Sequence, residues 1–397
     1  MRSRGTWAAA AAALMMLGVV ACSGNGTGAT GSPDGTPSAS ASASSGAVIT
    51  ASIPAGAKNV KVNRSVRLDV AHGTFSSVVV RSSSGPVPGS LSEDKASWQS
   101  TGRLQPGETY RVHGVAVDGQ GREQVYQTRF RTQALTNAKQ TYPSFFPQPG
   151  STVGVGMPVI IRFDVPVTDH ESIQKHLKVT STPAQTGAFH WISDHEVHWR
   201  PQKYWKPGTT VKVIADIDSV PAGNGVFGQL SRTNSFKIGR SLVSKVNMNT
   251  HQMRVFKDGK LIRTLPITTG QQPKFTTRSG TKVIIEKFRH KRMNSETVGI
   301  ARNSPDGYDI GDVEFAMRLT YSGEFVHAAP WSVASQGHAN VSHGCTGMST
   351  TNAGWFYEQS IIGDVIEYTG TDKAMTLSNG FGDWNLPFGE YAQGASL

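Results

Sequence analysis

The chain has 397 residues, of which 37% are hydrophobic and 17% are charged, enough for two or three domains of ordinary size. The formal net charge is +11, which suits an anionic wall or membrane surface. The Lys and Arg residues are scattered along the sequence rather than clustered, which argues against nucleic acid as a partner.

The N-terminus predicts export. Arg2 and Arg4 precede an alanine-rich apolar run that is too short to span a membrane comfortably, as in a signal peptide. The run ends in Val-Val-Ala-Cys at Cys22, which resembles a bacterial lipobox; the alternative is an ordinary secretory signal with an incidental cysteine. We assign residues 1–21 to a lipoprotein signal peptide. We therefore expect a lipid on Cys22 to anchor the protein to the cell membrane, facing the extracytoplasmic wall.

Two β-rich units follow a Gly-, Ser-, Thr- and Ala-rich tether, residues 22–46, whose composition cannot bury a core. In residues 47–135, short β-prone runs alternate with turns. The segment that ends in Tyr110 resembles the tyrosine corner of an immunoglobulin-like (Ig-like) sandwich. Residues 136–238 repeat this design. We predict two tandem Ig-like domains that hold the rest of the protein away from the membrane.

The second unit contains several histidines. A metal site would pair His195 with His198 and add a carboxylate such as Glu196. In the alternative interpretation, Val197 and Trp199 face the core and His198 lies on the solvent face of a strand. We favour this alternative because no second ligand pair has helical or hairpin spacing.

Residues 239–371 form the third predicted domain. An alternating run leads into a hairpin turn at Asp258 and Gly259, and a helix capped by Ser349 or Thr350 follows later. This domain is therefore predicted to be mostly β. Residues 372–397 form an extension that we expect to pack on it.

Cys345 is the only cysteine besides Cys22 of the export signal, so it has no disulfide partner. A thiol becomes a good nucleophile as the thiolate, and the imidazole of His327, at the end of an apolar run, can take its proton. The predicted helix begins just after Cys345, and the positive end of its dipole would lower the pKa of the thiol. The sequence thus predicts a Cys–His acyl-transfer site.

The order His327, a gap of under twenty residues, then Ser342, His343, Gly344 and Cys345 resembles the signature of the L,D-transpeptidases of bacterial cell walls. The His-x-x-Pro-Trp-Ser segment and the tail Gly-Asp-Trp-Asn resemble the actinobacterial branch with Ig-like domains. The resemblance is strong over roughly residues 240–390. It implies a mainly β fold: two Ig-like β-sandwich domains, then a mostly-β L,D-transpeptidase catalytic domain with a helix after the nucleophile.

The resemblance also implies roles for single residues. Cys345 attacks an amide carbonyl, and His327 acts as general base and acid, oriented by the backbone carbonyl of Ala328. The oxyanion is held by backbone N–H groups near Gly344 and Cys345, and near Tyr308. For His343, a catalytic role and a purely structural one stay open.

Further positions match the substrate site of the family. Tyr308, Ser322 and Gly323 line the donor pocket, and Met293 lies on a mobile flap; ordinary packing is the alternative for each of these residues. Gly347 stands where the family usually has Asn. The departure removes an amide that would orient the histidine loop or bind substrate, and so lowers activity or alters the acceptor.

The implied reaction joins two peptidoglycan stem peptides. A Cys345 thioester forms with release of D-alanine from a tetrapeptide donor stem, and an acceptor amine completes a 3→3 cross-link. No cofactor or metal is implied; zinc held by His327, His338 and Cys345 is set aside because no carboxylate lies nearby. Two alternatives stay open: a wall cysteine peptidase, and a non-catalytic wall-binding lipoprotein whose site has decayed at Gly347.

Overall fold

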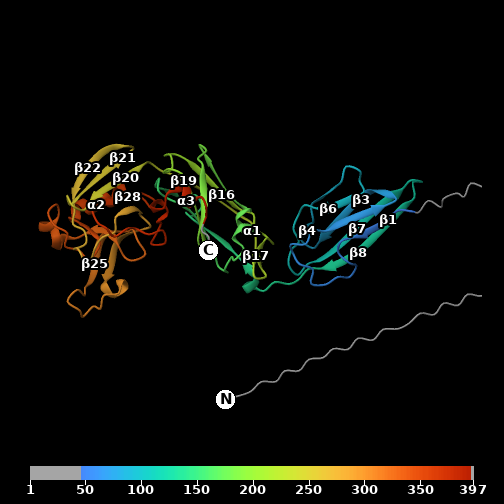
Figure 1. Cartoon of the computed structure of the whole chain (residues 1–397), viewed down its shortest axis with the longest axis horizontal. Coiled ribbons are helices and arrows are strands. Elements are labelled where there is room, and N and C mark those ends of the chain that lie inside the picture. Colours follow the sequence, from blue (N-terminus) through green and yellow to red (C-terminus); the bar gives the residue numbers. More distant parts are fainter. Residues whose placement is uncertain (1–45, 395–397) are drawn as a thin grey trace, which may run out of the picture. The chain divides into compact units, whose positions relative to one another are not determined.

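The structure is a computed structural model, and it describes residues 46–394 (Figure 1). The predicted signal peptide and lipobox, and all of the tether except its last residue, lie outside the described residues. Within residues 46–394, no helix is long and apolar enough to cross a membrane.

The first domain is a sandwich of two four-stranded sheets, with strand orders β1-β2-β6-β5 and β4-β3-β7-β8 (Figure 1). Side chains from both sheets form one core that includes Leu68, Phe75 and Phe130. The backbone N–H of Gln105 donates a hydrogen bond to the Tyr110 hydroxyl over 2.6 Å, which confirms the tyrosine corner. The strands are β1 Val48–Ala51, β2 Arg67–Ala71, β3 Gly73–Ser82, β4 Gly85–Pro86, β5 Gly89–Leu91, β6 Ser97–Ser100, β7 Thr109–Asp118 and β8 Glu123–Arg131.

The second domain repeats the sandwich, with sheets β10-β12-β15-β14 and β11-β19-β16-β13 and a small third sheet, β17-β18-β9. The strands are β9 Gln140–Thr141, β10 Pro143–Phe146, β11 Thr152–Val153, β12 Val159–Phe163, β13 Leu177–Thr182, β14 Gly187–Ser193, β15 Glu196–Pro201, β16 Thr210–Ala215, β17 Pro221–Gly223, β18 Val226–Gly228 and β19 Arg232–Ile238. The helical turns are η1 Asn137–Lys139 and α1 His170–Gln174.

The third domain has a five-stranded sheet, β22-β21-β20-β28-β23, and a four-stranded sheet, β24-β25-β26-β27. The strands are β20 Leu242–Asn247, β21 Gln252–Lys257, β22 Lys260–Pro266, β23 Gly280–Val283, β24 Glu286–Asn294, β25 Asp309–Arg318, β26 Phe325–Ala328, β27 Thr346–Met348 and β28 Val365–Thr369. The helices are η2 Ser295–Val298, η3 Pro330–Ser335, α2 Thr350–Gln359, η4 Asp383–Asn385 and α3 Phe388–Tyr391. The Ser349 hydroxyl caps α2 by accepting the N–H of Asn352, as predicted. The predicted mainly β fold is confirmed.

The core of the second domain continues into the third. Val283, Ile285 and Val365 of the third domain belong to the same buried cluster as the core of the second sandwich. A separate cluster, which includes Met253, Val326 and Phe356, fills the space between the two sheets and α2. The last two domains therefore share apolar contacts that neither can complete alone.

The C-terminal extension packs on more than the third domain, so the sequence-based expectation was incomplete. The side chain of Asn385 accepts the N–H of Thr281 in the third domain. The indole of Trp384 donates to the carbonyl of Gly156 in the second domain over 2.7 Å. The extension thus joins the two domains.

The expected position of His198 is wrong. Its side chain is 1% exposed because the extension covers this face of the sheet. One ring nitrogen lies 2.9 Å from an Asp383 oxygen, and the other lies 2.7 Å from an oxygen of Glu196. His198 is therefore buried as the cation of an ion pair with these two carboxylates. Across residues 46–394, no group of three or more His, Cys, Asp and Glu residues is arranged to hold a metal ion.

Candidate active site

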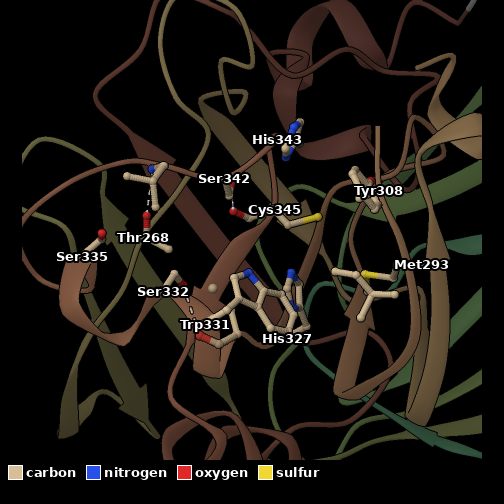
Figure 2. A pocket seen from close by; sticks show the side chains of 14 residues that line it. Thr268, Met293, Tyr308, His327, Trp331, Ser332, Ser335, Ser342, His343 and Cys345 are labelled. Carbon is tan, nitrogen blue, oxygen red and sulfur yellow. Dashed lines mark hydrogen bonds between the residues drawn. The ribbon is translucent and has the colours of Figure 1, made fainter. Parts of the chain in front are cut away.

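Cys345 and His327 line one cavity of about 320 Å³ in the third domain (Figure 2). His327 lies on β26 and Cys345 directly precedes β27. These strands pair in parallel, with His327 opposite Gly347, so the pairing brings the two side chains to the same cavity. Met293 and Tyr308 line the cavity from the β24–β25 hairpin. The sheet register therefore assembles residues that lie up to about fifty positions apart.

His327 is held in one tautomer. Its Nδ1 lies 2.7 Å from the carbonyl oxygen of Ala328, as predicted. A carbonyl only accepts hydrogen bonds, so Nδ1 carries the proton and Nε2 keeps a free lone pair. Burial lowers the pKa of His327, partly opposed by this hydrogen bond. The imidazole is therefore neutral at pH 7 and able to accept a proton.

The thiol of Cys345 is protonated at rest, contrary to the expectation of a lowered pKa. Burial of the Cys345 thiol disfavours the thiolate and raises the pKa of the thiol to about 11. The helix α2 begins only at Thr350, and strand β27 lies between it and Cys345. The effect of a helix dipole falls off within about one turn of the helix end, so it does little to lower the pKa of this thiol. The sulfur lies 3.5 Å from the carbonyl oxygen of Gly323, which accepts a hydrogen bond from the thiol. Neutral thiol and neutral imidazole are the resting pair.

The loop before Cys345 is closed by Ser342. Its hydroxyl donates to the carbonyl of Cys345 over 2.6 Å and accepts the N–H of Gly344 over 3.1 Å. Gly344 has φ +122°, a conformation that side chains disfavour. The Cys345 N–H has no acceptor among the described residues. The loop thus leaves one backbone donor beside the sulfur.

His343 is exposed and lines the same cavity as Cys345 and His327 (Figure 2). Its ring centroid lies 4.4 Å from that of Phe275 and 5.2 Å from that of Tyr308. These ring contacts favour the structural role over the catalytic one.

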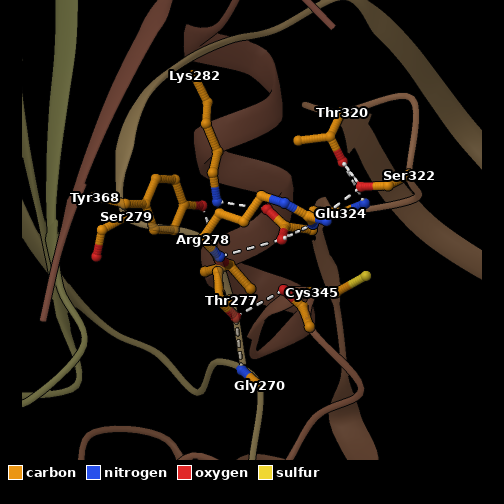
Figure 3. A network of polar contacts seen from close by, with 12 residues as sticks. Gly270, Thr277, Arg278, Ser279, Lys282, Thr320, Ser322, Glu324, Cys345 and Tyr368 are labelled. Atoms are coloured by element: carbon orange, nitrogen blue, oxygen red, sulfur yellow. Dashed lines mark hydrogen bonds and ion pairs between the residues drawn. The ribbon is translucent and has the colours of Figure 1, made fainter. Parts of the chain in front are cut away.

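A buried ionic network lies behind the nucleophile (Figure 3). Lys282 is fully buried, and its ammonium lies 2.5 Å from one carboxylate oxygen of Glu324 and 3.8 Å from the ring centroid of Tyr368. The other carboxylate oxygen accepts from Arg278 over 2.9 Å. The Tyr368 hydroxyl meets the Thr346 hydroxyl over 2.7 Å. The network therefore holds Thr346, the residue after Cys345, through its contact with Tyr368.

A second set of bonds fixes the carbonyl of Gly344. Thr277 donates its hydroxyl hydrogen to this carbonyl over 2.8 Å and accepts the N–H of Gly270 over 2.8 Å (Figure 3). Thr277 directly precedes Arg278, so the two sets of bonds share one backbone segment. Together they hold the Gly344–Cys345 peptide without any contact to the cavity.

The predicted donor-pocket residues divide into two groups. Met293, Tyr308 and Gly347 line the cavity, and burial raises the pKa of Tyr308 to about 12. Ser322 does not line it, because its hydroxyl accepts from Arg278 over 3.0 Å and also contacts Asn379. Gly323 is likewise absent from the lining and reaches the site only through the carbonyl that meets the thiol.

The position of Gly347 leaves little room for the usual Asn. A Cβ there would lie 3.0 Å from the methyl groups of Ala329 and Thr268. The amide of Gln336 instead holds the histidine loop, because its Nε2 donates to the Ala329 carbonyl over 3.1 Å. Gln336 is buried, so its side-chain amide can hold the loop after His327 although Gly347 has no amide to do so.

Sequence reasoning missed several of these residues. Trp331 is 58% exposed at the mouth of the cavity, and its ring centroid lies 6.0 Å from that of His327. Gln336 lies between His327 and Ser342, within the signature that resembles the L,D-transpeptidases. Its position therefore hinted at a role in the site. Lys282 had no such signal, because a lysine side chain is normally exposed.

Two parts of the chain match known protein families. Residues 242–367 match the L,D-transpeptidase catalytic domain, and residues 57–221 match a bacterial Ig domain. L,D-transpeptidase 2 of Mycobacterium tuberculosis is 37% identical over 348 residues, which cover 87% of this chain and 84% of that protein. L,D-transpeptidase 5 of the same species is 32% identical over 340 residues, covering 84% and 73%.

A solved structure of the LD transpeptidase LdtMt1 in complex with imipenem is also similar. It is 35% identical, with a TM-score of 0.51, and the match covers 58% of this chain and 99% of that one. The fold and the comparisons define the class: a transpeptidase, that is, an acyltransferase. This chain belongs to the L,D-transpeptidase family, and its function is the cross-linking of peptidoglycan.

Proposed function

We propose that Cys345 is the nucleophile of a 3→3 transpeptidation and that His327 is its general base and acid. The observation that carries the proposal is the shared cavity, which is lined both by a neutral imidazole whose Nε2 keeps its lone pair and by a protonated thiol. The thiol proton moves to Nε2 as sulfur attacks the donor amide carbonyl. The departing D-alanine amine takes that proton, leaving a thioester on Cys345. An acceptor amine then attacks the thioester and restores the thiol.

The oxyanion of each tetrahedral intermediate needs hydrogen-bond donors that are fixed before the reaction. The Cys345 N–H is such a donor, because it has no acceptor in the described part of the chain. The network around Lys282 and Thr277 supports this role by holding the adjoining peptide. Peptidoglycan stem peptides are the substrates, and the mechanism uses neither metal nor cofactor.

Carbapenem acylation tests the nucleophile, since a related enzyme was solved in complex with imipenem. One carbapenem is expected to add per chain, seen as a mass increase of the intact protein. Cys345→Ser should abolish the adduct. His327→Ala should slow its formation by roughly 10²–10⁴, the usual value of a positioned base. His343→Ala should cost much less. An adduct that survives in Cys345→Ser would place the chemistry elsewhere.

Muropeptide analysis tests the acceptor. Incubation with tetrapeptide-containing fragments should yield 3→3 dimers and free D-alanine. Release of D-alanine with tripeptides and no dimers would instead identify a peptidase that uses water.

We further propose that the protein is lipidated at Cys22 and anchored to the cell membrane, facing the wall. The lipobox-like sequence supports this. Cys22→Ala should move the protein from the membrane fraction to the medium, and unchanged retention would refute the anchor.

A further inference from the structure

The outer face of the first Ig-like domain carries a row of arginines. Arg81 on β3 pairs directly with Arg111 on β7, and Arg111 pairs with Arg129 on β8. Directly paired residues point to the same face, and neighbouring strands lie about 4.8 Å apart, so the three side chains form a line across the sheet. Arg131, two positions after Arg129, points the same way. All four residues are exposed.

These arginines lack a partner within residues 46–394. Among the described residues, none of the four side chains forms an ion pair or a hydrogen bond. The acidic neighbour, Glu108, accepts a hydrogen bond from the Ser83 hydroxyl over 2.6 Å instead. Like charges placed directly opposite each other destabilise a sheet, so the row opposes folding unless an anion neutralises it.

The surface around the row is concave. One hollow, of about 710 Å³, is lined by Arg81, Arg111 and Arg131 with the hydroxyl-bearing residues Ser82, Ser83 and Thr109. Gly107 and Glu108 complete this lining, so three arginines face a single carboxylate there. A second, of about 550 Å³, is lined by Arg81, Arg111 and Arg129 together with His113 and Gln127. The two hollows share Arg81 and Arg111, so they adjoin along one face. Hereafter this surface is the arginine groove.

We propose that the arginine groove binds an anionic polymer with repeating phosphodiester groups. Guanidinium groups bind phosphate oxygens through paired hydrogen bonds, and the hydroxyl groups of Ser82 and Thr109 in the first hollow can add further donors. A tetrahedral phosphate presents oxygens in several directions, which suits donors that converge from the walls of a hollow. Two adjoining hollows suit successive charges of one chain, whereas a flat membrane surface cannot enter them.

Binding tests use the full-length mature protein and fluorescently labelled poly(glycerol phosphate). We expect saturable binding that weakens steeply as salt rises, because the contacts are ionic. Arg111→Gln with Arg129→Gln should weaken binding about tenfold or more, since it removes two of the four guanidinium groups of the row. The matched control is Lys61→Gln with Arg64→Gln, which removes the same charge from exposed positions outside both hollows.

Further probes separate the ligand classes. Phosphatidylglycerol vesicles test a membrane surface, and polyglutamate tests carboxylates. The proposal fails if vesicles bind and the polymer does not, if polyglutamate binds equally well, if nothing binds, or if the control variant weakens binding to the same extent. Thermal unfolding checks the variants: loss of like-charge repulsion should leave the first domain at least as stable as before. Carbapenem acylation should be unchanged, which keeps this test independent of the active site.

Discussion

The first Ig-like domain closes its own hydrophobic core, whereas the second shares its core with the catalytic domain. In the first, the stacked rings of Tyr110 and Phe130, with centroids 5.2 Å apart, lie in a cluster made only of residues from that domain. In the second, the cluster extends to Val283 and Val365 of the catalytic domain. The two sandwiches are similar in fold, but only the second depends on the catalytic domain to complete its hydrophobic core.

Backbone contacts make the second domain inseparable from its neighbour. The N–H groups of Gly154 and Gly156 donate to the carbonyls of Ile362 and Gly363 over 2.8 and 2.9 Å. A Cβ on Gly154 would lie 2.3 Å from the backbone of the 363–364 segment, so only glycine permits this approach. The second domain thus acts as part of the catalytic framework, and the spacer role stays a prediction for the first domain alone.

Truncation should give the largest effect. A chain beginning at residue 136 keeps the shared core, and we expect it to fold and to react with carbapenem at the rate of the full chain. A chain beginning at residue 239 exposes side chains such as Ile285, each worth about 1.5–3 kcal/mol when fully buried. We expect it to unfold or aggregate. Thermal unfolding and intact mass report both outcomes. An unchanged melting temperature in the shorter chain would refute the shared core.

Asp383→Asn should give the next largest effect. It leaves His198 buried with only Glu196 as an anionic partner, and the loss of one member of a buried pair costs about 3–5 kcal/mol. Asp69→Asn in the first domain is the matched control, because the Arg67–Asp69 pair is about half exposed and is expected to contribute at most about 1 kcal/mol. Denaturant unfolding measures both changes. Equal effects would contradict the difference between the two domains.

The same ion pair predicts a pH dependence. Burial lowers the pKa of His198, but Asp383 and Glu196 outweigh it and raise the pKa from 6.5 to about 9. A raised pKa stabilises the fold below the unfolded value of 6.5, and this contribution is lost as pH rises through about 9. The joint unfolding transition of the second and catalytic domains should therefore weaken from pH 6.5 to 9, by about 3 kcal/mol at most. Asp383→Asn should flatten the profile.

Much of the fold follows from local patterns in the sequence. Short β-prone runs separated by turns predicted the two sandwiches, and the segment before Tyr110 predicted the tyrosine corner. Ser349 predicted the start of α2. The order of His327 and Cys345 also indicated the cavity. Each of these signals depends on residues close in sequence or on a motif whose spacing is itself the signal.

The failures come from contacts between distant segments. His198 lies 185 positions before Asp383, so its strand resembled an ordinary half-buried one until the extension covered it. The thiol pKa failed for a related reason: a helix following in sequence was visible, but the desolvation of Cys345 depends on the folded surroundings. Lys282 lies on β23, 42 positions before Glu324, and only the fold places the two side chains together.

Matched hydrogen-bond deletions in the two Ig-like domains should give the smallest and sharpest test. Tyr110→Phe removes the acceptor of the Gln105 N–H and should cost about 1 kcal/mol. The corresponding change in the second domain is Trp205→Phe, which removes the indole N–H that donates to the Met157 carbonyl over 2.7 Å, together with part of the buried ring.

The two variants should differ in which unfolding transition they move. Tyr110→Phe should lower the melting temperature of the first domain alone, by roughly 4–8 °C for a domain of this size. It should leave the catalytic transition and the carbapenem acylation rate unchanged, because the core around Tyr110 is separate. Trp205→Phe should lower the transition of the second and catalytic domains together, since Trp205 belongs to the cluster that contains Val283 and Val365. If Tyr110→Phe also shifts the catalytic transition, the first domain is coupled to the enzyme and is more than a spacer.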